Sequence, residues 1–228
     1  MKIGGIMNLT LLDFPEKVAC TVFTVGCNFR CPFCHNNTLV QGNNGKQIET
    51  NEALRFLQKR KNVLEGICLT GGEPLIQQGT EDFLKQVKDM GYAVKLDTNG
   101  AFPDKLQSLV EQKLVDYVAM DVKNSRERYP QTVGCSVDMA SICKSVEFLK
   151  SGVADYEFRT TITGNLHDEQ SIEQLAKWLV GAKRFYLQKF ENSGDLIDPY
   201  SVGCDEQQMR KYLEVVKKYV PTAELRGM

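Results

Sequence analysis

The chain has 228 residues, of which 42% are hydrophobic and 25% are charged, a composition typical of a globular domain with a core of its own. A formal net charge of −1 provides no large field that would attract nucleic acid or an anionic membrane, so neither is expected as a partner. The N-terminal residues lack the apolar segment of a signal peptide, and no stretch approaches the ~18 apolar residues that span a bilayer. We therefore expect a cytoplasmic protein with a single domain over residues 1–228.

Short β-branched runs alternate along the chain with longer segments of helical periodicity. Strands are expected at Lys17–Thr24, Gly66–Thr70, Tyr92–Asp97, Val115–Val122, Tyr156–Ile162 and Arg184–Leu187. Helices are expected at Asn51–Lys61 with Thr50 as its N-cap, Thr80–Met90 closed by Gly91, Asp104–Gln112, Ser136–Lys150, Glu169–Val180 and Asp205–Tyr219.

These elements form about six βα units, which predict an α/β fold with a parallel sheet covered by helices. The crossovers should be right-handed. Six units are too few for a complete eight-stranded barrel, so we expect a partial (β/α)6 barrel with the helices outside. In such folds the chemistry lies at the carboxyl ends of the strands.

Eight cysteines are many for a compartment in which disulfides are rare. Five of them are isolated in the sequence, and we expect them to be small buried hydrophobic residues: Cys20, Cys68, Cys135, Cys143 and Cys204. The other three, Cys27, Cys31 and Cys34, lie within the segment C-N-F-R-C-P-F-C-H-N. Their spacing can place three thiolates around a cuboidal iron–sulfur cluster and leave one iron without a protein ligand.

Two alternatives for the three cysteines remain open. A structural zinc site would need a fourth ligand, and the nearby candidate, His35, directly follows Cys34. Three ordinary core cysteines would lie in a more apolar loop than one that carries Asn28, Arg30 and Pro32. The spacing therefore favours the cluster.

The cysteine loop, with the aromatic Phe33 directly before Cys34, resembles the signature of the radical S-adenosylmethionine superfamily. The resemblance implies that Cys27, Cys31 and Cys34 bind one [4Fe–4S] cluster. It also implies that S-adenosylmethionine chelates the open iron through its amino and carboxylate groups, with Phe33 against the adenine. No catalytic side chain beyond the cluster and the cofactor is implied.

Thr70-Gly71-Gly72-Glu73-Pro74 follows the second expected strand. Alone, such a segment is only a turn. Glycines allow a ligand to approach the backbone closely, and a carboxylate can pair with an ammonium group. The segment resembles the family's motif for the methionine amino group, which makes Gly71, Gly72 and Glu73 cofactor contacts.

The next two strand ends carry Asp97-Thr98 and Met120-Asp121-Val122-Lys123. Turn chemistry at Asp97 and an ion pair between Asp121 and Lys123 are the alternatives to a functional role. Both segments resemble activating enzymes of glycyl-radical enzymes. That resemblance implies a sodium or potassium ion at Asp97, Thr98, Met120 and Asp121, beside the cofactor carboxylate, with Asp97, Thr98 and Lys123 also near the cofactor.

Two residues on later strands complete the expected cofactor site. Arg159 alternates with apolar neighbours and resembles the family's arginine on the corresponding strand, although an ion pair with a helix acid remains an alternative. Gln188 stands where the pyruvate formate-lyase activating enzyme has a histidine, which leaves its contact with the ribose open. His167 is expected at the surface without a role.

The segments Lys2–Ile6 and Asp13–Lys17, together with the cysteine loop, most resemble the anaerobic ribonucleoside-triphosphate reductase activating proteins. The implied reaction is reductive cleavage of S-adenosylmethionine to a 5′-deoxyadenosyl radical that removes hydrogen from a glycine of a partner glycyl-radical enzyme. The implied electron donor is a flavodoxin or a ferredoxin.

Two other functions compete with this one. The first is a radical enzyme that acts on a small molecule in cofactor or modified-base biosynthesis. The second is a non-catalytic iron–sulfur electron carrier, which requires a fully ligated cluster.

Overall fold

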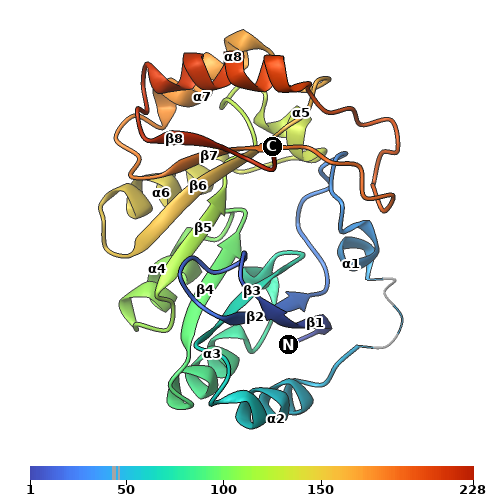
Figure 1. Cartoon of the computed structure of the whole chain (residues 1–228), viewed down its shortest axis with the longest axis vertical. Coiled ribbons are helices and arrows are strands. Elements are labelled where there is room, and N and C mark those ends of the chain that lie inside the picture. The colour runs from blue at the N-terminus through green and yellow to red at the C-terminus, as the bar shows by residue number, and fades with distance from the viewer. Residues whose placement is uncertain (43–44, 46) are drawn as a thin grey trace. The chain divides into compact units, whose positions relative to one another are not determined.

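The computed structural model describes residues 1–42, 45 and 47–228 (Figure 1). The strands are β1 (Ile3–Thr10), β2 (Ala19–Thr24), β3 (Gly66–Gly71), β4 (Ala93–Thr98), β5 (Tyr117–Asp121), β6 (Asp155–Ile162), β7 (Phe185–Lys189) and β8 (Ala223–Arg226). The helices are α1 (Asn37–Gln41), α2 (Thr50–Arg60), the 3-10 helix η1 (Pro74–Ile76), α3 (Thr80–Asp89), α4 (Pro103–Glu111), α5 (Tyr129–Val133), α6 (Met139–Lys150), α7 (Glu169–Trp178) and α8 (Glu206–Lys217). Among the described residues, no helix is both long and apolar enough to cross a bilayer.

The eight strands form one sheet in chain order, from β1 to β8. β1 runs antiparallel to β2, whereas β2, β3 and β4 are parallel to one another, as are β6, β7 and β8. The expected α/β class, with an open and mostly parallel sheet and helices around it, is confirmed. β1 and β8, the first and last strands of this sheet, were not predicted from the sequence.

The chain divides into two compact units. We call residues 1–28, 38–98 and 102–119 the first unit, and residues 29–37, 99–101 and 120–228 the second unit. The single domain expected from the sequence stays a prediction.

In the first unit, the α2 and α3 helices place Leu57, Phe83 and Leu84 in a fully buried core. The helix expected to begin after Thr50 instead begins at that residue, and Glu49 is its N-cap, without a side-chain bond. The expected cap was therefore wrong. The Thr50 hydroxyl instead donates to the backbone oxygen of Met1 over 3.2 Å. The α3 helix ends before Gly91, whose φ of +89° confirms the expected end.

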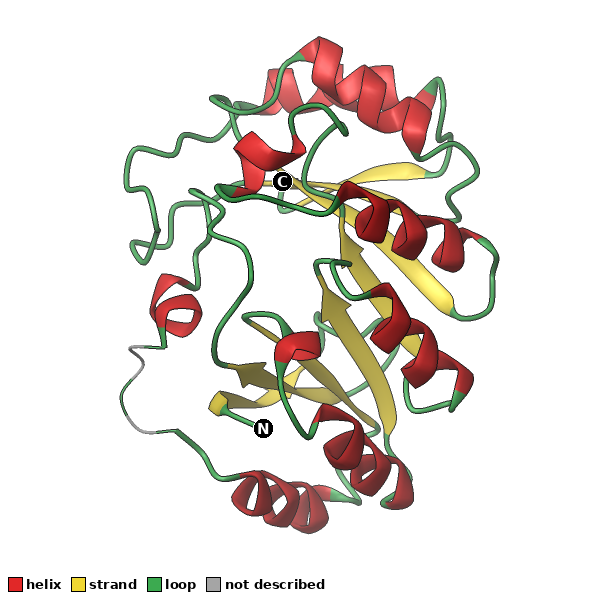
Figure 2. Cartoon of the chain, turned by 180° about the vertical axis from the view of Figure 1, so that it is seen from behind, coloured by secondary structure: helices red, strands yellow, loops and turns green. Residues whose placement is uncertain are grey.

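In the second unit, α7 and α8 pack together, and α8 contacts β7 and β8 (Figures 1 and 2). Phe158, Phe185 and Leu187 alternate with more polar neighbours along β6 and β7 and are fully buried, as expected for the covered face of a sheet. The α7 helix begins with a capping box between Asp168 and Ser171, which satisfies backbone donors at its first turn.

Candidate functional site

The cysteine loop passes from the first unit to the second between Asn28 and Phe29. In the first unit, the backbone N–H of Gly26, just before Cys27, donates to the oxygen of Leu39 over 2.8 Å. In the second unit, the N–H of Arg30 donates to Val133 over 2.8 Å, and the N–H of Cys34 donates to the oxygen of Cys31 over 3.0 Å. Backbone bonds therefore hold both halves of the loop.

The thiols of this loop are partly shielded from solvent. Cys31 is buried, Cys27 and Cys34 are half-buried, and Phe33 is 3% exposed. Burial raises the pKa of the Cys34 thiol, while the Asn36 backbone and the Lys123 ammonium oppose that rise. A thiolate at Cys34 therefore depends on a positively charged partner, such as a metal centre.

The eight cysteines are thiols rather than disulfide partners. Cys20 and Cys68 are fully buried as expected, and burial raises the pKa of Cys20 to about 12. The expected burial was wrong for Cys135, Cys143 and Cys204, which are half-buried. Cys135 and Cys204 lie in the segments that precede α6 and α8, where coverage by neighbouring elements is incomplete.

Gly71 ends β3, and the next residue, Gly72, lies directly against the start of the cysteine loop. Gly71 has a φ of +109°, a conformation that favours glycine. A Cβ atom on Gly72 would lie 1.9 Å from the backbone oxygen of Gly26, and the N–H of Glu73 donates to that same oxygen over 2.8 Å. This close approach exists because neither glycine carries a side chain.

Replacing Gly72 by alanine should therefore destabilise the protein by about 1–3 kcal/mol or more, because a backbone atom has to move. The matched control is Gly5→Ala, since a Cβ on Gly5 meets nothing within 4 Å. We expect that control to change the free energy of unfolding by less than about 0.5 kcal/mol. Denaturant unfolding of both variants measures the difference, and equal stability would contradict the tight contact.

Glu73 is a buried carboxylate with fixed geometry. Its side chain is 1% exposed, and Oε1 accepts from the backbone N–H of Leu75 over 3.0 Å and from the hydroxyl of Thr98 over 2.8 Å. The first bond caps η1. Glu73 thus stabilises the turn after β3, as the sequence left open. Its carboxylate is held at the carboxyl ends of β3 and β4.

Asp97 lies in a polar cluster on β3 and β4. It forms an ion pair with Lys95, whose side chain is 3% exposed, and its Oδ2 accepts from the hydroxyl of Thr70 over 3.4 Å. The Cys68 thiol lies 3.6 Å from Oδ1 of Asp97. Lys95 was not predicted to belong to the site, although a charged residue between the apolar Val94 and Leu96 was a usable signal.

Asp121 is paired with two cations of the second unit. Lys123 Nζ and Arg159 Nε lie 2.9 Å from its two carboxylate oxygens. Burial alone would raise the pKa of Asp121, but the Arg159 guanidinium and the Lys123 ammonium outweigh it and hold that pKa well below its usual range. Burial would lower the pKa of Lys123, and the Asp121 carboxylate reverses that shift. The three groups are therefore charged together at neutral pH.

The monovalent-cation site at Asp97, Thr98, Met120 and Asp121 stays a prediction. Thr98 and Met120 are buried, at 3% and 0% exposure. Each carboxylate has a protein cation beside it, Lys95 at Asp97 and both Lys123 and Arg159 at Asp121.

His167 is buried rather than exposed, so the expected surface position was wrong. Its Nδ1 lies 3.2 Å from the backbone N–H of Thr163, and its Nε2 lies 3.0 Å from the backbone oxygen of Lys123. Burial lowers the pKa of His167. A neutral ring can accept a hydrogen bond from the backbone N–H of Thr163 and donate one to the backbone oxygen of Lys123. These two bonds hold the backbone at Lys123 in place.

Gln188 is half-buried on β7, in register with Thr161 on β6 and Arg226 on β8. Arg159 shares the same face of the sheet, since it lies two residues before Thr161. Whether Gln188 contacts a cofactor ribose stays a prediction.

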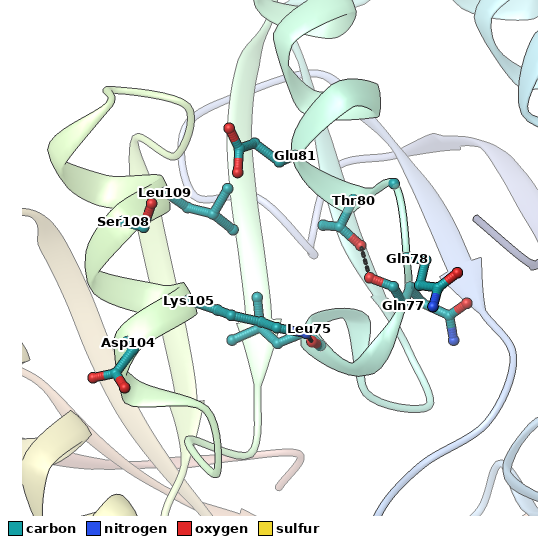
Figure 3. A pocket seen from close by; sticks show the side chains of 10 residues that line it. Leu75, Gln77, Gln78, Thr80, Glu81, Asp104, Lys105, Ser108 and Leu109 are labelled. Atoms are coloured by element: carbon teal, nitrogen blue, oxygen red, sulfur yellow. Dashed lines mark hydrogen bonds between the residues drawn. The ribbon is translucent and has the colours of Figure 1, made fainter.

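A cavity of about 490 Å³ in the first unit lies between α3, η1 and α4 (Figure 3). Its lining includes Leu75, Gln77, Thr80 and Lys105, and Lys105 Nζ donates to the backbone oxygen of Leu75 over 2.7 Å. No residue predicted to bind the cluster or the cofactor lines it. Within residues 1–42, 45 and 47–228, no three His, Cys, Asp or Glu side chains form a ready-made metal site.

The chemistry of the residues fits an iron–sulfur cluster and an amino-acid ligand. The donor set is three thiols on one loop, and thiolates are the ligands that such clusters use. The Gly72 backbone approaches Gly26, at the start of that loop, too closely for any side chain, and the fixed Glu73 carboxylate follows it. Such a carboxylate suits an ammonium group.

Relatives of known name span much of the chain. A Methanocaldococcus jannaschii protein named "Putative glycyl-radical enzyme activating enzyme" is 30% identical over 98% of this chain and 95% of its own. The 7-carboxy-7-deazaguanine synthase of Thermoplasma acidophilum is 33% identical over 57% of each chain. The pyruvate formate-lyase-activating enzyme of Clostridium pasteurianum is 30% identical over 54% of this chain and 52% of its own.

A radical SAM methyltransferase from Sphaerobacter thermophilus has a similar fold, with a TM-score of 0.74 over 96% of this chain and 68% of that chain, at 13% identity. The model of the family described as the Radical SAM superfamily matches residues 21–179. This match includes the cysteine loop, the Gly-Gly-Glu-Pro segment and both acidic strand ends. The chain therefore belongs to the radical S-adenosylmethionine superfamily, whose enzymes use one [4Fe–4S] cluster and S-adenosylmethionine.

Proposed function

We propose that this enzyme activates a glycyl-radical enzyme, of which anaerobic ribonucleotide reductase is the first candidate. The observation that carries the proposal is the similarity, over 98% of this chain, to a protein named as an activating enzyme of that class. The partial similarity to a pyruvate formate-lyase-activating enzyme agrees with it.

The bound groups supply the radical chemistry. Held by Cys27, Cys31 and Cys34, the cluster would supply one electron, received from a flavodoxin or ferredoxin, for reductive cleavage of S-adenosylmethionine, and this chemistry would remove a hydrogen atom from the partner's glycine. The products would be methionine, 5′-deoxyadenosine and a glycyl radical, so atoms and electrons balance.

The chain's own residues bind and orient the reactants. We assign Cys27, Cys31 and Cys34 to the cluster, and the fixed carboxylate of Glu73 to the methionine ammonium. Phe33, 3% exposed, is assigned to the adenine. Arg159 and Lys123 are held by Asp121, so their charges are already placed when the cofactor carboxylate and ribose arrive.

The test is anaerobic reconstitution with iron and sulfide, followed by dithionite and S-adenosylmethionine. We expect slow formation of 5′-deoxyadenosine by the enzyme alone, and a glycyl radical signal in electron paramagnetic resonance when the correct partner is added. A partner whose radical-bearing glycine is replaced by alanine is the control. Cofactor cleavage without a glycyl radical on any candidate partner would contradict activation.

A second candidate is a radical enzyme that acts on a small molecule. The similarity to a 7-carboxy-7-deazaguanine synthase, 33% identical over 57% of the chain, favours it. This function predicts that a heterocyclic substrate, and no protein, accelerates the formation of 5′-deoxyadenosine. Membership of the radical S-adenosylmethionine family favours either of these enzymes over a non-catalytic electron carrier.

A further inference from the structure

The face of β6, β7 and β8 opposite the buried aromatic and aliphatic residues is polar. Its members alternate with those buried residues and are Glu157, Arg159, Thr161, Tyr186, Gln188, Glu224 and Arg226. Parallel strands in register place paired residues on one face, so Arg226 lies beside Gln188 and Gln188 beside Thr161. Arg226 and Glu157 do not belong to the candidate cofactor site.

Arg226 is held in one orientation on this face. Its Nη1 and Nη2 donate to the two carboxylate oxygens of Glu157 over 2.8 and 3.1 Å. Its guanidinium carbon lies 3.7 Å from the centre of the Tyr186 ring. The Glu157 side chain is 1% exposed, whereas the Arg226 side chain is 38% exposed. A buried carboxylate and an aromatic ring thus fix a guanidinium that still faces solvent.

Stability alone does not account for this arrangement. Burying a carboxylate costs free energy, and a buried ion pair is often no more stable than apolar residues of similar volume. A guanidinium carries five N–H donors, of which the two bonds to Glu157 use two. Because the Arg226 side chain is already fixed, it loses less conformational entropy when a ligand binds.

We propose that Arg226 binds a backbone carbonyl oxygen of the glycine-bearing segment of the partner enzyme, an inference that rests on the proposed function. Glu157 already balances the charge of Arg226, so a neutral carbonyl suits the site better than a carboxylate, which Glu157 would repel. The Tyr186 ring provides an apolar surface beside it for a peptide backbone. The backbone of Arg226 pairs with Gln188, but its guanidinium lies over Tyr186, which is in register with Arg159 of the candidate cofactor site.

The experiment measures binding of a labelled glycine-segment peptide from the partner that the wild-type enzyme activates. The reconstituted enzyme is first loaded with S-adenosylmethionine. Arg226→Lys keeps the charge but loses the bidentate geometry. We expect its Kd for the peptide and its KM for the partner to rise about tenfold to a hundredfold. Cofactor cleavage without partner and kcat at saturating partner should stay at wild-type values. Arg210→Lys, on the exposed side of α8, is the matched control.

Removing Arg226 alone would leave Glu157 buried without this partner, so a second variant guards against unfolding. The double variant Glu157→Gln/Arg226→Gln removes both charges together. We expect it to unfold near the wild-type temperature and to bind the peptide as weakly as Arg226→Lys.

Wild-type peptide affinity in both variants would overturn the proposal and leave the pair a structural one. Competition by a small carboxylate that depends on Arg226 would also overturn it, since the ligand would then be an anion. Failure of the proposed function has a different signature, because the wild-type enzyme would then form no glycyl radical on any partner.

Discussion

Replacement of any one of Cys27, Cys31 or Cys34 by alanine is expected to abolish both visible iron–sulfur absorbance and cleavage of S-adenosylmethionine. A cluster held by three thiolates has no spare protein ligand, so two cysteines cannot retain it as three do. Iron content per chain and formation of 5′-deoxyadenosine after anaerobic reconstitution measure the two losses.

The half-buried Cys135, Cys143 and Cys204 provide the controls, because alanine at these positions leaves little empty volume. Each of these variants should keep wild-type iron content and activity. Loss of the cluster in one of them, or its retention in an alanine variant of the loop, would show that the ligands are assigned wrongly. Cys20 and Cys68 are poorer controls, since both are fully buried.

Replacement of Glu73 by glutamine should weaken the binding of S-adenosylmethionine about tenfold to a hundredfold while leaving the cluster intact. Glutamine keeps an oxygen that can accept from Leu75 and Thr98, so η1 stays capped, but it lacks the charge that pairs with the methionine ammonium. Equilibrium binding to the reconstituted enzyme measures the change.

The Glu73→Ala variant separates the two roles of this residue. It loses the cap as well as the charge, so it should also lose about 0.5–2 kcal/mol of stability. Unchanged cofactor affinity in Glu73→Gln, with lower stability in Glu73→Ala, would mean that the carboxylate serves the turn alone.

The strands that could be predicted are those with continuous β-branched or apolar runs. β2 reads A-C-T-V-F-T and is buried on both faces, a pattern typical of a parallel strand. β1 was missed because Gly4, Gly5 and Asn8 interrupt its pattern, and the strand is defined by pairing with β2 rather than by local propensity. β8 has four residues, too few to show a period of two.

The candidate site likewise contains features that the sequence predicts and features that it does not. Local motifs predicted the cysteine loop, the double glycine and the acidic strand ends, because each motif is contiguous in sequence. The Glu157–Arg226 pair joins residues 69 positions apart, and His167 reaches a backbone oxygen 44 positions away. Such contacts have no local signature, so only the fold reveals them.

The burial of His167 links folding to proton binding. Burial lowers its pKa from the ordinary value of 6.5, so the folded protein binds fewer protons at this residue than the unfolded chain does. Acidification below about pH 6.5 therefore favours the unfolded state, by up to about 1.4 kcal/mol per pH unit until the pKa of the folded state is reached. The segment that carries Lys123 is thus held most firmly at neutral and alkaline pH, where the ring of His167 is uncharged in both states.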